Sequence, residues 1–205
     1  MNRKIIICIG RQLGSGGHDI GRMLALDFQA KYYDRELLNL AAKESGLSEK
    51  FLAQNDERKG FFKSLLNIQV THMGNNTYKP NFSQESLFQF QSDAMMKAAD
   101  AGSCVFVGRC AEYILRNNPN MVSIFITAPM EFRIHQVMNK EGVSRIVAQK
   151  KIEHGESQRA AYYNYYTGKK WGHATSYDLC IDSSILGLPA TEKFIAEFIR
   201  KKFNL

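Results

Sequence analysis

The chain has 205 residues, 44% hydrophobic and 23% charged, with a formal net charge of +7. This length fits one domain with a substantial buried core. No stretch approaches the ~20 apolar residues of a membrane span, and the short apolar run from Ile5 to Ile9 lacks a secretory cleavage site. The positive charge suits anionic ligands. Because the basic residues are scattered, nucleic acid is the weakest candidate partner.

The cysteine pattern argues against a metal site. The four cysteines, Cys8, Cys104, Cys110 and Cys180, have no metal-ligand spacing. Three of them, Cys8, Cys104 and Cys180, lie in apolar, strand-like runs, where cysteine is usually a small buried hydrophobe. These features predict a protein of the reducing cytoplasm.

The start of the chain has the pattern of a phosphate site. The run from Ile5 to Ile9 predicts a buried strand, three glycines and a serine follow between positions 14 and 17, and helical spacing begins near the last glycine. Backbone N–H groups of such a turn converge on an anion at the positive end of the helix dipole. The residues expected to bind the cofactor's phosphates are Arg11, Gly14, Ser15, Gly16, Gly17 and His18.

This loop departs from the two common phosphate-binding motifs. Against the Walker A pattern Gly-x-x-x-x-Gly-Lys-Ser/Thr, Gly16 matches the second glycine, but Arg11 stands at the first, Gly17 at the lysine and His18 at the hydroxyl residue. The Rossmann pattern fails because Asp19 stands at its last glycine. A tight strand-to-helix turn without a ligand is the alternative interpretation.

The rest of the chain alternates strands and helices. After a short strand at 31–35, Asp34 is placed to cap a helix, a second helical pattern covers 47–54, and 60–83 forms a long polar stretch. Further strands are predicted at 103–108, 121–127 and 177–182, and helices at 83–101, 111–115, 130–140, 143–166 and 189–203. Apolar strands alternating with helices predict an α/β fold with a parallel sheet covered on both faces.

Ligands of such sheets bind beyond the carboxyl ends of the strands. The residues expected to meet there are Gly14 to His18, Asp34, Arg35, Gly108, Arg109, Thr127 and Asp182. Arg109 follows a buried strand directly and is the strongest arginine ligand. From their places on predicted helices, Arg133 and Arg145 are explained better as solvated residues than as ligands.

Four stretches resemble the cytidylate-kinase-like family, a branch of the P-loop nucleoside monophosphate kinases. They are Gly10-Arg11-Gln12-Leu13-Gly14-Ser15-Gly16-Gly17, Tyr33-Asp34-Arg35-Glu36-Leu37, Val107-Gly108-Arg109 and the segment from Tyr162 to Asp182. The resemblance covers essentially the whole chain. It implies a three-layer α/β/α fold with a five-stranded parallel sheet, as one domain over residues 1–205, with a monophosphate-binding insertion at about 35–100 and a lid at about 143–175.

The resemblance also implies the roles of individual residues. The glycine loop would bind the phosphates of ATP in the presence of Mg²⁺, and arginines of the lid would bind the phosphoryl group during its transfer. Phosphoryl transfer depends on charge neutralisation, and the planar fork of arginine binds phosphate through two bonds. The implied catalytic residues are Arg159, Arg109 and His18, and the implied substrate-binding residues are Asp34, Arg35, Arg58, Gly108, Arg109 and Asp182.

Three positions differ from the family pattern. Relatives carry arginine where His18 stands, and cations where Ser157 and Gln158 stand. Two functions therefore stay open. One is an ATP- and Mg²⁺-dependent phosphotransferase acting on a nucleoside monophosphate or another small acceptor. The other is a nucleotide-binding sensor or interaction protein with little catalytic activity.

Overall fold

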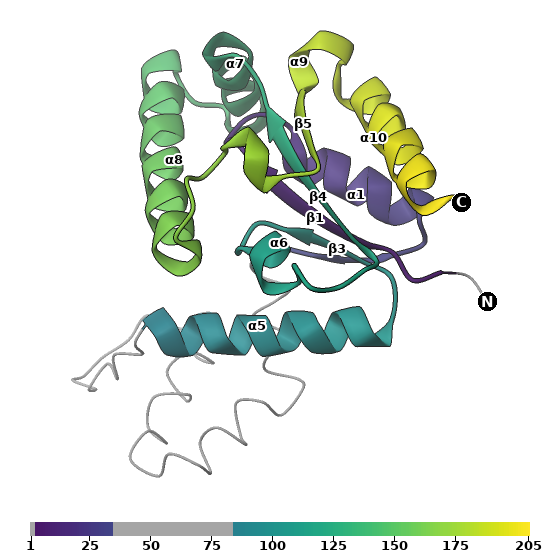
Figure 1. Cartoon of the computed structure of the whole chain (residues 1–205). Helices are drawn as coiled ribbons and strands as arrows, with labels where there is room; N and C mark the ends of the chain where they lie inside the picture. Colours follow the sequence, from purple (N-terminus) through teal and green to yellow (C-terminus); the bar gives the residue numbers. More distant parts are fainter. Residues whose placement is uncertain (1–2, 35–83) are drawn as a thin grey trace, which may run out of the picture.

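A five-stranded parallel sheet forms the centre of the protein, in the strand order β2-β3-β1-β4-β5 (Figure 1). The structure is a computed structural model that describes residues 3–34 and 84–205. The central strand β1 pairs on both sides, with Ile7 opposite Val105 on β3 and opposite Val122 on β4. The strands are β1 (Ile6–Arg11), β2 (Lys31–Tyr33), β3 (Cys104–Val107), β4 (Met121–Thr127) and β5 (Leu179–Asp182).

Helices cover both faces of the sheet and give the expected three layers (Figure 1). Successive side chains of a strand point to opposite faces. Ile7 and Ile9 therefore pack against α1 and α10, whereas Ile6 and Cys8 pack against α5 and α6. The helices are α1 (Gly17–Asp27), α5 (Gln84–Ala101), α6 (Ala111–Ile114), α7 (Met130–Glu141), α8 (Arg145–Thr167), α9 (Ser183–Leu186) and α10 (Leu188–Phe203). A 3₁₀ turn at Ala174–Ser176 precedes β5.

Helices α7 and α8 form a pair with a small core of their own. Ile134 and Val137 of α7 contact Ala148 and Ile152 of α8, and all four are buried. At its other end α8 reaches α5, where the rings of Tyr166 and Phe88 stack with centroids 4.0 Å apart. Helix α8 is thus held at its two ends and lies beside the sheet rather than on it (Figure 1).

The strands and helices predicted within the described residues are all present, with ends that differ by up to two residues. The short helix α9 was not predicted. The expectation that Cys180 is buried is wrong, because β5 is the outermost strand and the core under α5 and α6 contains no β5 residue. Cys8, Cys104 and Cys110 are buried and free.

The helical pattern at 47–54, the polar stretch at 60–83 and the helix expected after Asp34 lie outside the described residues. No helix in the described part of the chain has both the length and the apolar character that crossing a membrane requires.

Candidate functional site

The glycine loop between β1 and α1 is packed tightly against two helices. Gly14 and Gly16 have φ angles of +84° and +76°, a left-handed conformation that glycine adopts readily. A Cβ atom on Gly14 would lie 2.6 Å from the carbonyl oxygen of Arg133, and one on Gly16 would lie 2.3 Å from the side chain of Leu188. The loop therefore depends on glycine for both its conformation and its contacts.

Ser15 fixes the same loop to the sheet. Its side chain is fully buried, and its hydroxyl donates to the carbonyl oxygens of Gln12 at 2.9 Å and Ile126 at 3.1 Å. Its own carbonyl accepts a hydrogen bond of 2.7 Å from the hydroxyl of Ser183. The Ser15 side chain thus shapes the loop and does not face a ligand.

Gly17 stands at the position of the Walker lysine, and its missing side chain leaves room for the side chain of Arg11. Its φ lies outside the left-handed region, so the backbone at the start of α1 does not itself require glycine. A Cβ atom there would lie 2.5 Å from Cβ and 2.8 Å from Cγ of Arg11. The stem of Arg11 occupies the space in which a side chain at position 17 would begin.

The guanidinium of Arg11 continues from this point to Gly108, which follows β3. Its Nη1 atom lies 2.2 Å from where a Cβ atom on Gly108 would be. Burial, together with the charges of Arg159 and Arg109, lowers the pKa of Arg11 to about 9, so it stays a cation at pH 7. Its Nε atom is buried and has no hydrogen-bond partner within the described structure.

The neutral ring of His18 accepts a hydrogen bond from this guanidinium and so orients it. The ring Nε2 lies 3.1 Å from Nη2 of Arg11, and Nδ1 lies 2.9 Å from the hydroxyl of Tyr32. Because a guanidinium only donates, Nε2 accepts, and the single ring proton sits on Nδ1 and is donated to Tyr32. Burial and the charge of Arg11 lower the pKa of His18 to about 4. His18 therefore adds no positive charge to the site at pH 7.

A second strained turn, after β3, presents Arg109. Gly108, Arg109 and Cys110 have successive φ angles of +81°, +59° and +56°. For residues other than glycine this conformation costs roughly 1–2 kcal/mol each. The guanidinium of Arg109 lies over the ring of Tyr162, 4.9 Å from its centroid. The Tyr162 hydroxyl in turn donates to Gln91 at 3.2 Å.

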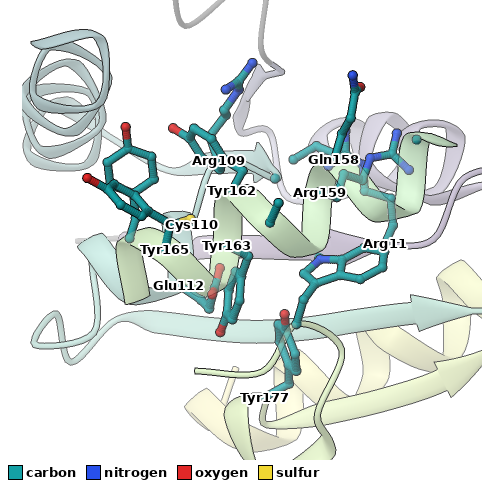
Figure 2. Close-up of a pocket in the computed structure, with 17 residues that line it drawn as sticks. Arg11, Arg109, Cys110, Glu112, Gln158, Arg159, Tyr162, Tyr163, Tyr165 and Tyr177 are labelled. Carbon is teal, nitrogen blue, oxygen red and sulfur yellow. The ribbon is translucent and has the colours of Figure 1, made fainter. Parts of the chain in front are cut away.

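A pocket of about 760 Å³ lies between the ends of β1 and β3 and the inner face of α8. Three arginines line it, Arg11, Arg109 and Arg159, and Figure 2 shows their side chains along one side. Burial lowers the pKa of Arg159, and its Nη1 atom has no partner in the described structure. Three cations in one pocket are suited to a ligand with several negative charges.

The sequence model of the cytidylate kinase-like family matches residues 6–185. The chain belongs to this family. No curated protein matches the chain.

Two solved structures resemble this cytidylate kinase-like protein along nearly its whole length. An uncharacterized protein from Eubacterium ventriosum ATCC 27560 is 30% identical, with a TM-score of 0.75 over 97% of this chain and 99% of the other. Shikimate kinase from Bacteroides thetaiotaomicron is 10% identical, with a TM-score of 0.53 over 97% and 99% of the two chains. The second likeness concerns the fold alone, and it is the fold of P-loop kinases.

The predicted site residues divide into those that meet at the pocket and those that do not. Arg11, Gly108, Arg109 and Arg159 line it. The loop from Gly14 to His18 is joined to it through Arg11, which contacts both Gly17 and His18.

The other predicted residues of this cytidylate kinase-like chain lie elsewhere. Asp182 does not reach the pocket lining, because its Oδ1 accepts from the N–H of Ser184 at 2.8 Å and caps α9. The hydroxyl of Thr127 is bonded to Gln12. The negative charge of Asp34 partly opposes the lowering of the pKa of His18. Arg35 and Arg58 fall outside the described residues.

Two residues differ from what the sequence indicates. Arg133 is neither solvated nor a ligand, because it is 5% exposed, donates to the Ala128 carbonyl at 2.8 Å and pairs with Glu156 of α8. Glu112 is a pocket residue that sequence reasoning missed. The only signal was an acidic residue in the first turn of a helix, which the helix dipole explains without any ligand. Arg145 pairs with Glu131 on the surface, as a solvated residue would.

Proposed function

We propose that this protein is an ATP-dependent phosphotransferase in which Arg11 replaces the lysine of the P-loop. One observation supports this above all others. Arg11 stands at the position of the first Walker glycine. Its side chain passes over Gly17, which stands at the position of the Walker lysine, and its guanidinium ends beside Gly108. The loop thus regains a cation between the phosphate-binding turn and the pocket that contains Arg109 and Arg159.

The residues present fit the phosphates of ATP. Gly14, Gly16 and Gly17 have no side chains of their own to cover the backbone N–H groups of the turn, and their Cβ sides are packed against Arg133, Leu188 and Arg11. No side chain of the described residues caps α1 at Gly16, so its first N–H groups are available to an anion. Arg11 would add a charge beside them, and its buried Nε has a hydrogen bond to give.

The loop fits Mg²⁺ less well. The Walker hydroxyl that binds this ion is replaced by His18, whose two ring nitrogens are both in hydrogen bonds. The described residues contain no cluster of three metal-binding side chains. We therefore assign no residue of the loop to Mg²⁺ and derive no step through it.

The chain's own residues would act by neutralising charge. Transfer forms a bond from an acceptor oxygen to the γ-phosphorus of ATP and breaks the bond to the bridging oxygen, which leaves with ADP. Arg11 and Arg159 would stabilise the negative charge of the transferring group, and Arg109 would hold an anionic acceptor. Helix α8 covers the pocket and would exclude water during the step.

The test is acceptor-dependent ADP formation with a panel of nucleoside monophosphates. Arg159→Ala should lower the rate about 100-fold or more, because it removes a cation that acts on the transition state. Arg116→Ala is the matched control, because this arginine is exposed and its Nη1 donates to the Tyr113 carbonyl. Absence of any acceptor-stimulated ADP formation by the wild type would reject the proposal.

A second function, a nucleotide sensor with slow transfer, is favoured by the state of the lid. Gln158 lines the pocket at a position where relatives carry a cation. The hydroxyl of Ser157 donates to the Glu153 carbonyl at 3.0 Å, and Arg133 forms an ion pair with Glu156. As a phosphotransferase the wild type should be slow, and Gln158→Arg should speed it. If neither Gln158→Arg nor Arg159→Ala changes the rate, the lid is not catalytic and the sensor function stands.

A further inference from the structure

Three side chains from separate elements form a hydrogen-bonded row beside the glycine loop. Arg11 is the last residue of β1, His18 lies in the first turn of α1, and Tyr32 is the middle residue of β2. Nη2 of Arg11 lies 3.1 Å from Nε2 of His18, and Nδ1 of His18 lies 2.9 Å from the hydroxyl of Tyr32. Arg11 lines the pocket, whereas His18 and Tyr32 do not. Tyr32 can therefore act on the pocket only through His18.

The packing of β2 against α1 brings the Tyr32 hydroxyl to His18. Gly21 lies one turn after His18, and a Cβ atom on it would be 3.3 Å from Cε2 of Tyr32 and 3.0 Å from Cγ2 of Val107. The missing side chain at Gly21 thus lets the Tyr32 ring lie against the helix. The guanidinium of Arg22 lies over the same ring, 5.5 Å from its centroid. These contacts hold the ring, so its hydroxyl has a defined position.

The place of the ring proton of His18 decides whether this row holds together. A neutral imidazole has one donor and one acceptor nitrogen, and the partners of the ring set which is which. Because a guanidinium only donates, Arg11 requires a bare Nε2, which places the proton on Nδ1. A half-buried N–H group needs an acceptor, and the oxygen of Tyr32 is placed to be one. Burial raises the pKa of Tyr32, so its hydroxyl stays neutral at pH 8.

Removing the Tyr32 oxygen would leave the Nδ1 proton without its acceptor. The ring could then satisfy its proton only by carrying it on Nε2 instead or by turning away. Either change breaks the bond to Arg11, because Nε2 no longer presents a lone pair to the guanidinium. Phenylalanine at position 32 would fill the same space and keep the packing on Gly21, so the hydroxyl can be tested separately from the ring.

We infer that Tyr32 is a positioning residue, whose hydroxyl oxygen selects the tautomer of His18 that holds the Arg11 guanidinium at the glycine loop. The inference rests on the proposed function, in which Arg11 replaces the P-loop lysine. Tyr32 does not touch the reacting groups in this arrangement. It fixes the direction of a cation that does, two hydrogen bonds away.

The tautomer of His18 is measured by ¹⁵N NMR at pH 8 without any nucleotide. The chain has five histidines, and His18→Gln identifies the signals of His18. The wild type should carry its ring proton on Nδ1, and Tyr32→Phe should move it wholly or partly to Nε2. Tyr33→Phe is the matched control, because Tyr33 is the next residue of β2 and stacks on Phe106 on the other face of the sheet. This control should leave the tautomer and the rate of transfer unchanged.

The rate of ADP formation shows whether the tautomer matters for transfer. Tyr32→Phe should lower the rate about 10- to 100-fold, because Arg11 keeps its charge and loses its alignment. In a His18→Ala background there is no ring to orient, so Tyr32→Phe should lower the rate no further. A hydroxyl that only stabilised β2 would lower the rate by the same factor in both backgrounds and would leave the tautomer unchanged.

Three results would each overturn the inference. They are a wild-type His18 protonated on Nε2, an unchanged tautomer in Tyr32→Phe, and a loss of rate that persists in the His18→Ala background. Active transfer with the proton on Nε2 overturns the inference and leaves the proposed function standing. Absence of transfer by the wild type rejects the proposed function, and the tautomers of the wild type and Tyr32→Phe then still decide whether Tyr32 positions Arg11.

Discussion

Exchanging the residues at positions 11 and 17 should move the cation of the glycine loop back to the Walker position. The double variant Arg11→Gly/Gly17→Lys recreates the spacing Gly-x-x-x-x-Gly-Lys. Each single change should impair the protein and the pair should rescue it, because the stem of Arg11 and a side chain at position 17 compete for one volume.

The contacts give the size of each effect. Gly17→Lys alone places its Cβ 2.5 Å from Cβ of Arg11 and adds a second cation beside it, so the free energy of unfolding should fall by about 1–3 kcal/mol. Arg11→Gly alone loses the bond to His18 but also removes a buried charge, so stability should change little. Its rate of transfer should fall about 100- to 1,000-fold, or roughly 3–4 kcal/mol.

The assays are ADP formation with the best acceptor, ATP binding by calorimetry and urea denaturation. In a double-mutant cycle the two positions should couple by about 2–3 kcal/mol, near the upper end for residues in contact. A double variant that folds cooperatively but stays as inactive as Arg11→Gly would refute the replacement of the lysine by Arg11. So would full activity of Arg11→Gly.

Three further predictions concern the surroundings of Arg11. The pKa of His18 is lowered to about 4 in the folded state, against about 6.5 when unfolded, so the native protein binds fewer protons between these values. The free energy of unfolding should therefore decrease as pH falls from 6.5 towards 4. Urea titrations of His18→Gln should show a weaker decrease, and a pH dependence identical to that of the wild type would contradict the buried neutral ring. Arg109→Ala should weaken monophosphate binding by up to about 3 kcal/mol and leave ATP binding nearly intact in calorimetry; equal loss of both ligands would show that the two subsites are wrongly assigned. Glu156→Gln should cost about 3 kcal/mol of unfolding free energy, because it leaves the buried charge of Arg133 without a negative partner, whereas Glu141→Gln in the exposed pair with Lys151 should cost less than about 1 kcal/mol. Similar losses in urea melts would mean that burial does not set the strength of the first pair.

The sheet and the position of the site could be predicted because they depend on local patterns. Unbroken apolar runs such as Met121–Thr127 are typical of strands covered on both faces, and Arg109 follows such a run directly. Parallel strands bring their carboxyl ends to one edge, which placed Gly108 and Arg109 together near the glycine loop.

The rest depended on contacts between residues distant in the chain. The Walker pattern requires a lysine at position 17, where this chain has glycine, and gives no sign that the side chain of Arg11, six positions earlier, crosses the loop to this place. Arg133 is buried because Glu156 meets it from another helix, 23 residues away. Glu112 becomes a pocket residue only through the placement of α8, whose Tyr163 lies beside it in Figure 2.

The contacts of the glycine loop with Ser183 and Leu188 have a consequence for synthesis of the protein on the ribosome. Gly16 packs on Leu188, and the carbonyl of Ser15 accepts from Ser183, so a loop near the start of the chain is shaped by residues made more than 160 positions later. A nascent chain that has not yet emerged past Leu188 has the glycines but not the cradle. Affinity for ATP should therefore arise late and abruptly during translation, and ribosome-bound chains of increasing length would show it as a step.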